Sequence, residues 1–266
     1  MKEKKIITAR GNVYYWISEG KNDNCIVFCH GLTADHTLFD MQIEEWSKDY
    51  TVITWDIPLH GKSKEYDDFS IENAAKDLRQ ILQTEQLNQI VIVGQSAGGY
   101  IAQAFIQLYP DMVSAFIGID TTPFGMSYYK KSEQFWIKHY ADIAKWYPYE
   151  MYCKLGAKSV SVTKESYQSF YDCLKRLGKK GMLKAADLVY KDFLNCKEVD
   201  IKCPVLLLLG EYDRTGYVKR YNEMWKKRTG FPIKIIPNAS HNSNFDNYVF
   251  FNGIVMEFLN KNIRGN

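Results

Sequence analysis

The sequence lacks the long apolar runs, paired cysteines and leader pattern that mark membrane, metal-knuckle and secreted proteins. Its longest apolar runs, at 90–94 and 204–210, fall far short of the roughly 18 residues that a membrane helix needs, so no membrane insertion is expected. The six cysteines form no C-x-x-C pair, which argues against a zinc knuckle or a thioredoxin-like centre. The charged first residues are not followed by an apolar segment, so we expect no secretory signal and a cytoplasmic protein.

Charge of one sign is not in excess, and repeats and linkers are missing. Lys and Arg number 34 against 31 for Asp and Glu, a net charge of +3 scattered along the chain. A nucleic-acid partner is therefore not expected. No repeat, low-complexity tract or Gly/Ser linker divides the 266 residues, which suffice for a substantial buried interior. The composition is compatible with a monomer or a homodimer.

Short apolar runs alternate with amphipathic segments along most of the chain. The first two, at 4–10 and 12–19, are rich in β-branched and aromatic residues and predict a hairpin joined at Gly11. The later runs are almost continuously apolar, as in strands covered on both faces; they lie at 25–29, 51–56, 89–94, 114–120 and 204–210. Helical patterns lie at 38–48, 70–85, 97–110 and 218–228. This alternation predicts an α/β protein whose mostly parallel sheet has helices on both faces.

One segment interrupts the alternation. Between 123 and 197 no buried-strand run occurs, and helical patterns dense in aromatic rings follow one another. We interpret 123–197 as a helical cap inserted into a core made of 1–122 and 198–266. Most of its rings are expected to pack against the core, and the remainder to line an apolar pocket. These rings include Tyr128, Tyr129, Phe135, Trp136, Trp146, Tyr147, Tyr149 and Tyr152.

A single serine stands between two glycines where a predicted strand meets a predicted helix. Gly94, Ser96 and Gly98 fit the pattern G-x-S-x-G. A sharp strand-to-helix turn strains the backbone of its central residue, and neighbours without side chains let the chain pass closely. The Ser96 hydroxyl would then be exposed at the positive end of the following helix, where developing negative charge is favoured. Ser96 is therefore the predicted nucleophile.

A serine hydroxyl is scarcely ionised at neutral pH and needs a base to accept its proton. Of the five histidines, His241 lies in a loop after the short apolar run 231–237, where a sheet presents groups at its carboxyl edge. His241 is therefore the predicted base. The remaining histidines are expected to be structural or exposed: His30 and His60 in loops, and His36 and His139 at the surface or in the cap.

The histidine needs a carboxylate that fixes its tautomer and stabilises the imidazolium. Asp213 follows the apolar run 204–210 in a loop at the end of a predicted strand, and it is the predicted acid. Asp120, which ends the run 114–120, is the rival acid. With Asp213 the catalytic residues follow in the chain order serine, aspartate, histidine.

Two backbone N–H groups are predicted to stabilise the oxyanion of an acyl-transfer reaction. Ala97 offers one directly after the nucleophile, and Leu32 offers the second in the loop after the run 25–29. Gly31 lets this loop approach the nucleophile, and His30 is expected to be a structural member of the loop.

Together these motifs resemble the α/β-hydrolase superfamily. The matching pieces span nearly the whole predicted core in the expected order: HG at 30–31, WDIPLHGKS at 55–63, GQSAGG at 94–99, GEYDRTG at 210–216 and SH at 240–241. The resemblance implies the eight-stranded α/β-hydrolase fold. It also argues against epoxide hydrolases and haloalkane dehalogenases, which place an aspartate where this chain has Ser96. One departure is Leu59, where the family commonly has a glycine, and it leaves the geometry of that turn open.

The expected function is hydrolysis of a carboxylic ester or thioester with a small to medium apolar acyl group. The substrate is a small molecule, and the predicted mechanism through an acyl-enzyme requires no metal and no organic cofactor. Two alternatives stay open. One is a C–C hydrolase or an elimination enzyme similar to the menaquinone-pathway synthase, and the other is a low-turnover ligand-binding protein. Arg176 is the only arginine in the predicted cap, which lowers the case for an anionic substrate.

Overall fold

The computed structural model of the chain describes residues 1–18, 20 and 25–263. Glu19, which we expected to end the second strand, and residues 264–266 of the predicted core lie outside the described residues. The strands of the described part form a single sheet in the order β1-β2-β4-β3-β5-β6-β7-β8. They are β1 (Lys2–Thr8), β2 (Gly11–Ile17), β3 (Cys25–Cys29), β4 (Thr51–Trp55), β5 (Ile90–Gln95), β6 (Val113–Ile119), β7 (Val205–Gly210) and β8 (Ile233–Ile236).

The sheet is mostly parallel, as predicted. The hairpin of β1 and β2 is antiparallel, and β2 also runs antiparallel to β4. From β4 through β3, β5, β6 and β7 to β8 every pairing is parallel. All residues of β3, β5 and β7 are buried, because helices cover both faces of the central strands. The predicted fold class is thereby confirmed.

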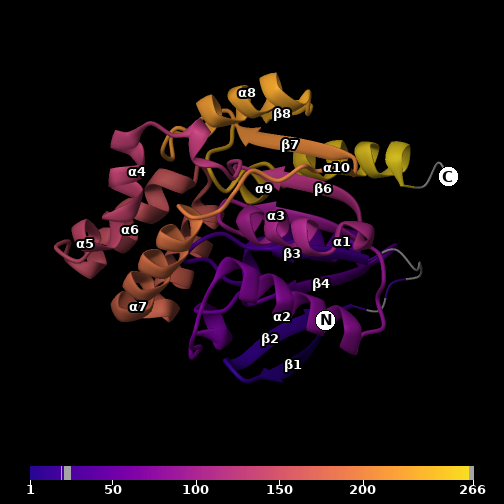
Figure 1. Cartoon of the computed structure of the whole chain (residues 1–266), viewed down its shortest axis with the longest axis horizontal. Helices are drawn as coiled ribbons and strands as arrows, with labels where there is room; N and C mark the ends of the chain where they lie inside the picture. The colour runs from indigo at the N-terminus through magenta and orange to yellow at the C-terminus, as the bar shows by residue number, and fades with distance from the viewer. Residues whose placement is uncertain (19, 21–24, 264–266) are drawn as a thin grey trace.

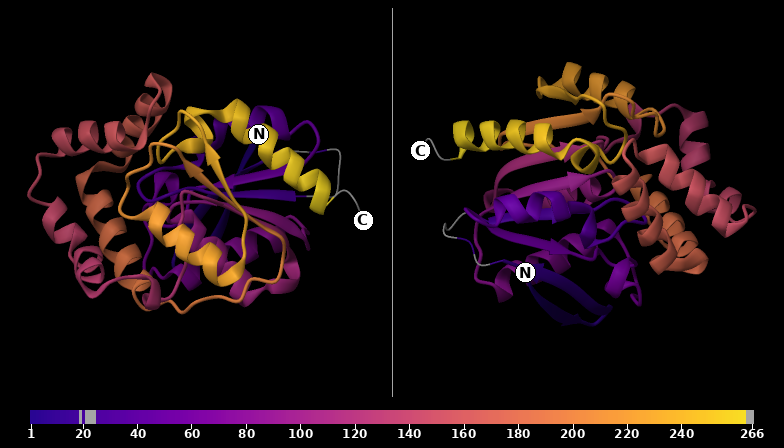
Figure 2. Two further views of the ribbon diagram at one scale, coloured as in Figure 1. Left: turned by 90° about the horizontal axis from the view of Figure 1, so that it is seen from above. Right: turned by 180° about the vertical axis from the view of Figure 1, so that it is seen from behind.

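Helices cover the two faces of the sheet (Figure 1). One face packs against α2 (Ile71–Thr84), α3 (Gly98–Leu108) and α8 (Val218–Thr229). The other packs against α1 (Asp40–Trp46) and α10 (Tyr248–Asn262). Figure 2 shows α8 and α10 on opposite sides of the sheet. Short helical turns complete the core: His36–Phe39, Gly61–Ser63, Pro110–Met112 and α9 (Ser243–Asp246).

The segment between β6 and β7 is helical and extends from one end of the sheet (Figure 1). It contains a turn at Met126–Tyr128 and the helices α4 (Lys131–Lys138), α5 (Tyr140–Ala144), α6 (Tyr149–Val160) and α7 (Lys164–Phe193). Gly178 breaks the regular geometry inside α7 with φ +75°, a conformation open to glycine. None of the described helices is both long and apolar enough to cross a membrane. The boundaries 123 and 197 of the cap stay a prediction.

The parallel strands bring the residues that follow them to one edge of the sheet. Ser96 comes directly after β5 and Asp120 directly after β6. Asp213 follows β7, and His241 follows β8. Because parallel strands end at the same edge, four residues that are far apart in the sequence gather beneath the helices α4–α7.

Candidate active site

Ser96 occupies a strained turn between β5 and α3. Its φ is +50°, a left-handed value that is uncommon for a residue with a side chain. A Cβ added to Gly98 would lie 2.0 Å from the carbonyl oxygen of Cys29, and one added to Gly94 would lie 2.6 Å from the Cα of Gly99. Both glycines are therefore required by close backbone packing. The turn is held in place because Ser96 N donates to the Ile119 carbonyl at 2.8 Å.

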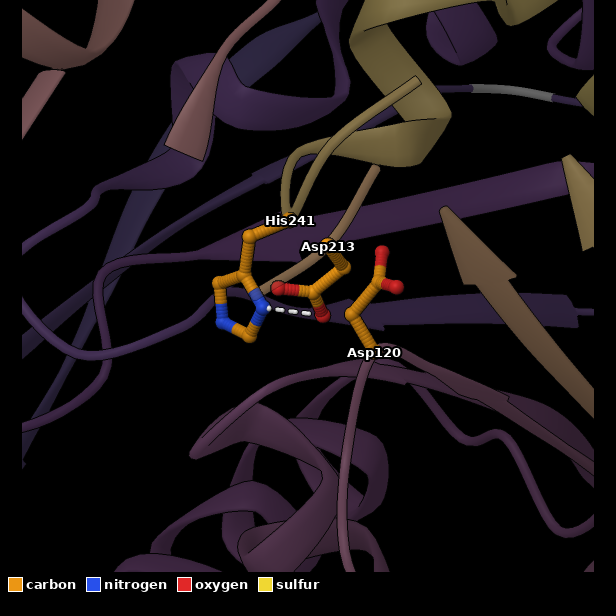
Figure 3. A group of neighbouring side chains, drawn as sticks. All are labelled: Asp120, Asp213 and His241. Atoms are coloured by element: carbon orange, nitrogen blue, oxygen red, sulfur yellow. Dashed lines mark hydrogen bonds and ion pairs between the residues drawn. The ribbon is translucent and has the colours of Figure 1, made fainter. Parts of the chain in front are cut away.

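His241 and Asp213 form a buried hydrogen-bonded pair (Figure 3). Nδ1 of His241 lies 2.9 Å from Oδ2 of Asp213. The other carboxylate oxygen, Oδ1, accepts a hydrogen bond from Thr215 N at 2.8 Å, which fixes the orientation of the acid. A proton on Nδ1 leaves Nε2 of the imidazole unprotonated, the state in which it accepts a proton.

The charges of this pair shift both pKa values. Burial lowers the pKa of His241, but the charge and hydrogen bond of Asp213 outweigh burial, so that pKa lies above 6.5, its ordinary value. Burial raises the pKa of Asp213, but the facing His241 and the hydrogen bonds outweigh it and lower that pKa. An ionised acid therefore faces a histidine whose protonated form is stabilised.

Asp120, the rival acid, lies beside the pair and has other partners. Its Oδ1 accepts from Gly210 N at 2.7 Å, and its Oδ2 accepts from the hydroxyl of Ser243. Burial and the charge of Asp213 raise the pKa of Asp120 well above its ordinary range. Of the two acids, Asp213 is thus the one that bonds the imidazole.

Among the described residues, Asp120, Asp213 and His241 form the group of side chains that is compact enough to hold a metal ion. Their potential ligand atoms all lie within 4.8 Å of one another. However, Nδ1 of His241 is directed at Asp213, and both oxygens of Asp120 accept hydrogen bonds from protein donors. These atoms already have partners within the protein. The arrangement therefore fits a histidine beside two acids better than a metal site with free ligand atoms.

Ser96 and His241 line the same two cavities. One measures about 130 Å³ and is also lined by Leu32, and the other measures about 380 Å³. Within the described residues, Ser96 Oγ has no hydrogen-bond partner, so its hydroxyl is free to meet a substrate. The expected hydrogen bond from Ser96 to His241 is therefore not formed here. Hydrogen bonds between a nucleophile and its base often tighten only when the substrate binds.

The predicted oxyanion donors both lie next to the nucleophile: Ala97 follows Ser96 in the chain, and Leu32 lines the 130 Å³ cavity together with Ser96. In the described part of the chain, the backbone N–H groups of Leu32 and Ala97 have no protein acceptor. A Cβ added to Gly31 would lie 3.1 Å from Cβ of Ser96, so the loop that carries Leu32 packs directly against the nucleophile. Two unpaired donors beside Ser96 are suited to an oxyanion.

Gln95 is a site residue that sequence reasoning missed. Its Nε2 donates to the carbonyl of His241 at 2.9 Å, which joins the turn of Ser96 to the loop of the predicted base. A Cβ added to Gly31 would lie 2.1 Å from Oε1 of Gln95. Gln95 therefore contacts both loops around the nucleophile. Its position inside G-x-S-x-G was the only available signal.

Two of the remaining histidines, His30 and His36, have partners within the protein. His30 accepts from Ile57 N at 3.0 Å through Nε2, and burial lowers its pKa, as a structural residue requires. His36 is partly exposed, with 25% of its side chain accessible, and it also has two protein partners. Its ring stacks on Trp16 with centroids 3.5 Å apart, and Nδ1 contacts Asp56 at 2.7 Å. The pairing of β2 with β4 brings these residues together, and a sequence read locally does not reveal it.

The turn that contains Leu59 keeps the geometry that a glycine would allow. Leu59 has φ +78°, and its N–H donates to the carbonyl of Ser63 at 3.0 Å. The leucine side chain is buried, so its packing offsets the strain of the left-handed backbone.

The helices between β6 and β7 also contact the site. Arg176 of α7 donates through Nε and Nη2 to Oδ2 of Asp35, at 2.9 and 2.7 Å. Asp35 belongs to the loop that carries Leu32. Arg176 thus joins α7 to the predicted oxyanion loop. Tyr140 and Tyr190 line both cavities at Ser96, and neither was singled out by the sequence, where they are two tyrosines among 19.

The chain is similar in sequence to known hydrolases and to a synthase. A family model described as alpha/beta hydrolase fold matches residues 24–152. A protein of Bacillus subtilis (strain 168), provisionally named 2-succinyl-6-hydroxy-2,4-cyclohexadiene-1-carboxylate synthase, is 25% identical over 95% of this chain and 97% of its own. The 2-(acetamidomethylene)succinate hydrolase of Mesorhizobium japonicum is 22% identical over 87% of this chain and 86% of its own.

Solved structures share the fold over the full length. A thermophilic esterase from Thermogutta terrifontis superposes with a TM-score of 0.75 at 19% identity and covers 98% of this chain and 99% of its own. N-acyl homoserine lactonase AidH, complexed with N-butanoyl homoserine, gives a TM-score of 0.78 at 20% identity and covers 100% of this chain and 99% of its own.

Proposed function

The chain belongs to the α/β-hydrolase superfamily, and on this premise we propose that it is a serine hydrolase acting by acyl transfer on an uncharged ester or thioester. Ser96 attacks the carbonyl carbon while His241 accepts its proton and then returns it to the leaving group. Asp213 orients the imidazole, and the N–H groups of Leu32 and Ala97 stabilise the oxyanion. Water then hydrolyses the acyl-enzyme by the same route.

The observation that carries this proposal is the combination of a strained serine and a paired histidine on one cavity wall. Ser96 has φ +50°. His241, which is hydrogen-bonded to the buried Asp213, lines the same cavities as Ser96. Strain of this kind persists where the surrounding structure enforces it, and it is common at catalytic residues. This supports turnover over the low-turnover ligand-binding alternative.

The walls of the larger cavity support an apolar acyl group. Aromatic side chains predominate there, including Tyr100, Tyr129 and Phe193. Among the described residues that line either cavity at Ser96, none is a lysine or an arginine. Structural neighbours include an esterase and an N-acyl homoserine lactonase, and both names refer to ester-type bonds.

The alternative of an elimination or C–C hydrolase reaction has one specific point in its favour, the similarity to the provisionally named Bacillus synthase. An anionic substrate such as a carboxylate needs a cationic partner when it is buried. Arg176 does not supply one, because it pairs with Asp35 at 2.7 Å. The ester or thioester proposal therefore has the stronger support.

A panel of p-nitrophenyl esters, acyl thioesters and acyl lactones tests the proposed reaction. We expect hydrolysis of at least one of these classes by the native protein and none above background by Ser96→Ala. Elimination that forms a succinyl-hydroxy-cyclohexadiene-carboxylate product, with every ester, thioester and lactone left intact, would instead establish the alternative.

A further inference from the structure

A third cavity adjoins the two at Ser96 and has no assigned role. It measures about 450 Å³ and is formed by residues of α4, α5 and α6 and the segment after α5. Neither Ser96 nor His241 lines it. We name it the outer cavity. Its volume lies within the range of about 300–1,000 Å³ that small-molecule sites occupy.

The outer cavity shares a wall with the catalytic cavities. Tyr140, Tyr152, Gly156 and Ser159 line both the outer cavity and the 130 Å³ cavity that contains Ser96. In the described part of the chain, Tyr140 is the one residue that lines all three cavities. Its hydroxyl lies 2.8 Å from that of Tyr152. Tyr140 and Tyr152, whose hydroxyls are paired, therefore form part of the partition between the outer cavity and the cavity that contains Ser96.

The lining of the outer cavity is apolar and partly exposed. Trp136, Ile143 and Leu155 line it while 61%, 39% and 54% of their surfaces remain accessible. Among its described lining residues, none is charged. Large apolar side chains that gather around an open hollow indicate a binding surface, because leaving them in contact with water is unfavourable.

We propose that the outer cavity binds the distal part of a linear apolar acyl chain whose carbonyl carbon lies at Ser96. The chain passes the partition formed by Tyr140 and Tyr152 and covers the apolar side chains beyond it. This inference rests on the proposed hydrolase function and specifies its substrate class as an ester or thioester of a medium to long fatty acid. The shared wall favours a continuous chain over a separate second ligand.

Leu155→Asp tests the proposal without altering the catalytic cavities, because Leu155 is half-exposed and lines only the outer one. Val249→Asp is the matched control: Val249 is 69% exposed on α10 and lines none of the three cavities. The kcat/KM of each variant is measured on p-nitrophenyl butanoate, octanoate and dodecanoate, below the concentrations at which they aggregate. Butanoate serves as the internal control, because the proposal requires only the longer chains to extend past the partition.

We expect Leu155→Asp to lower kcat/KM for dodecanoate by about tenfold or more, in line with the cost of disturbing a hydrophobic pocket. We expect butanoate to change by less than about twofold, and Val249→Asp to match the native protein throughout. An equal loss for all chain lengths, or an unchanged ratio of dodecanoate to butanoate, would overturn the proposal.

A binding measurement separates this proposal from the hydrolase proposal. Dodecanoic acid with a bromine at its far end quenches nearby indole fluorescence, and Trp136 lines the outer cavity. Trp136 also lines the cavity of about 380 Å³ at Ser96, whereas Leu155 lines the outer cavity alone. We expect saturable quenching in the native protein, loss of most of it in Trp136→Phe and much weaker quenching in Leu155→Asp. Unchanged quenching in Leu155→Asp would place the chain in the catalytic cavity and refute the outer site. Quenching without hydrolysis of any ester would refute the hydrolase and retain the chain site, whereas butanoate hydrolysis without quenching would refute the chain site alone.

Discussion

Nδ1 of His241 donates to Oδ2 of Asp213 across 2.9 Å, inside a buried cluster that contains a second carboxyl group (Figure 3). The second group, Asp120, accepts its hydrogen bonds from Gly210 and Ser243. Two acids thus lie at the ends of neighbouring strands, and one of them bonds the imidazole. The proposed mechanism depends on this division of roles, and substitution of each acid in turn tests it.

Asparagine substitutions of Asp213 and Asp120 test which of the two acids orients His241. Asp213→Asn removes the charge that orients the imidazole, and we expect kcat to fall by about 10³- to 10⁴-fold, the loss found when a triad acid is replaced by its amide. Asp120→Asn replaces an acid that bonds Gly210 and Ser243 and not the imidazole, so kcat should stay within about tenfold of native. Steady-state kinetics on one ester gives both values, and a larger loss for Asp120→Asn would reverse the assignment.

The pH dependence of kcat/KM reports the state of His241. The base is active when it is unprotonated, and the charge of Asp213 places its pKa above 6.5 despite burial. Activity should therefore rise with pH through a value above 6.5. In Asp213→Asn the stabilising negative charge is lost, so the rise should move to lower pH. A rise that stays at the same pH in the variant would show that Asp213 does not act on the base.

Two glycine-to-alanine substitutions test the packing of the turn. A Cβ at Gly98 would lie 2.0 Å from the carbonyl oxygen of Cys29, whereas one at Gly253 in α10 meets nothing within 4 Å. We expect Gly98→Ala to lower the free energy of unfolding by about 1–3 kcal/mol and to reduce activity. Gly253→Ala should raise stability by about 0.5–1 kcal/mol. Urea unfolding measures both, and equal effects would contradict the close approach at Gly98.

The ion pair of Arg176 and Asp35 links α7 to the predicted oxyanion loop. Burial raises the pKa of Asp35, but Thr37 and Arg176 outweigh burial and bring it to about 2, below its ordinary 3.8. The carboxylate therefore stabilises the fold above pH 3.8 and loses that contribution as pH falls through 2. Since the Arg176 side chain is 49% exposed, we expect Arg176→Ala to cost about 1–2 kcal/mol at pH 7.

The control for that measurement is Lys158→Ala, because Lys158 is exposed on α6. Its unfolding free energy should lie within about 0.5 kcal/mol of native. If Arg176→Ala were as stable as Lys158→Ala at pH 7, the ion pair would contribute nothing measurable to the docking of α7.

Much of the fold could be predicted because each signal is local. Continuous apolar runs predicted buried strands, and β3, β5 and β7 are buried along their whole length. The motif around Ser96 predicted a strained turn, and its φ of +50° agrees. Strand ends, turn residues and chain order do not require knowledge of distant contacts, so one sequence is enough to infer them.

The rest depends on contacts between distant residues. His36 packs against Trp16 through the pairing of two strands, and Arg176 reaches Asp35 from 141 positions away. Tyr140 acquires its role only because α5 and α6 fold over the sheet edge, and its neighbours in the sequence are equally aromatic. The packing of α4–α7 determines the cavities that these helices line, and no short motif encodes that packing.

Labelling with a fluorophosphonate probe at neutral pH tests the central claim most directly, since the probe modifies a serine only when a base activates it. Intact-protein and peptide mass spectrometry should locate one covalent adduct on Ser96 of the native protein. Ser96→Ala should carry none, and His241→Ala should react far more slowly. A native protein that remains unlabelled, or an adduct that persists in Ser96→Ala, would contradict the proposed nucleophile.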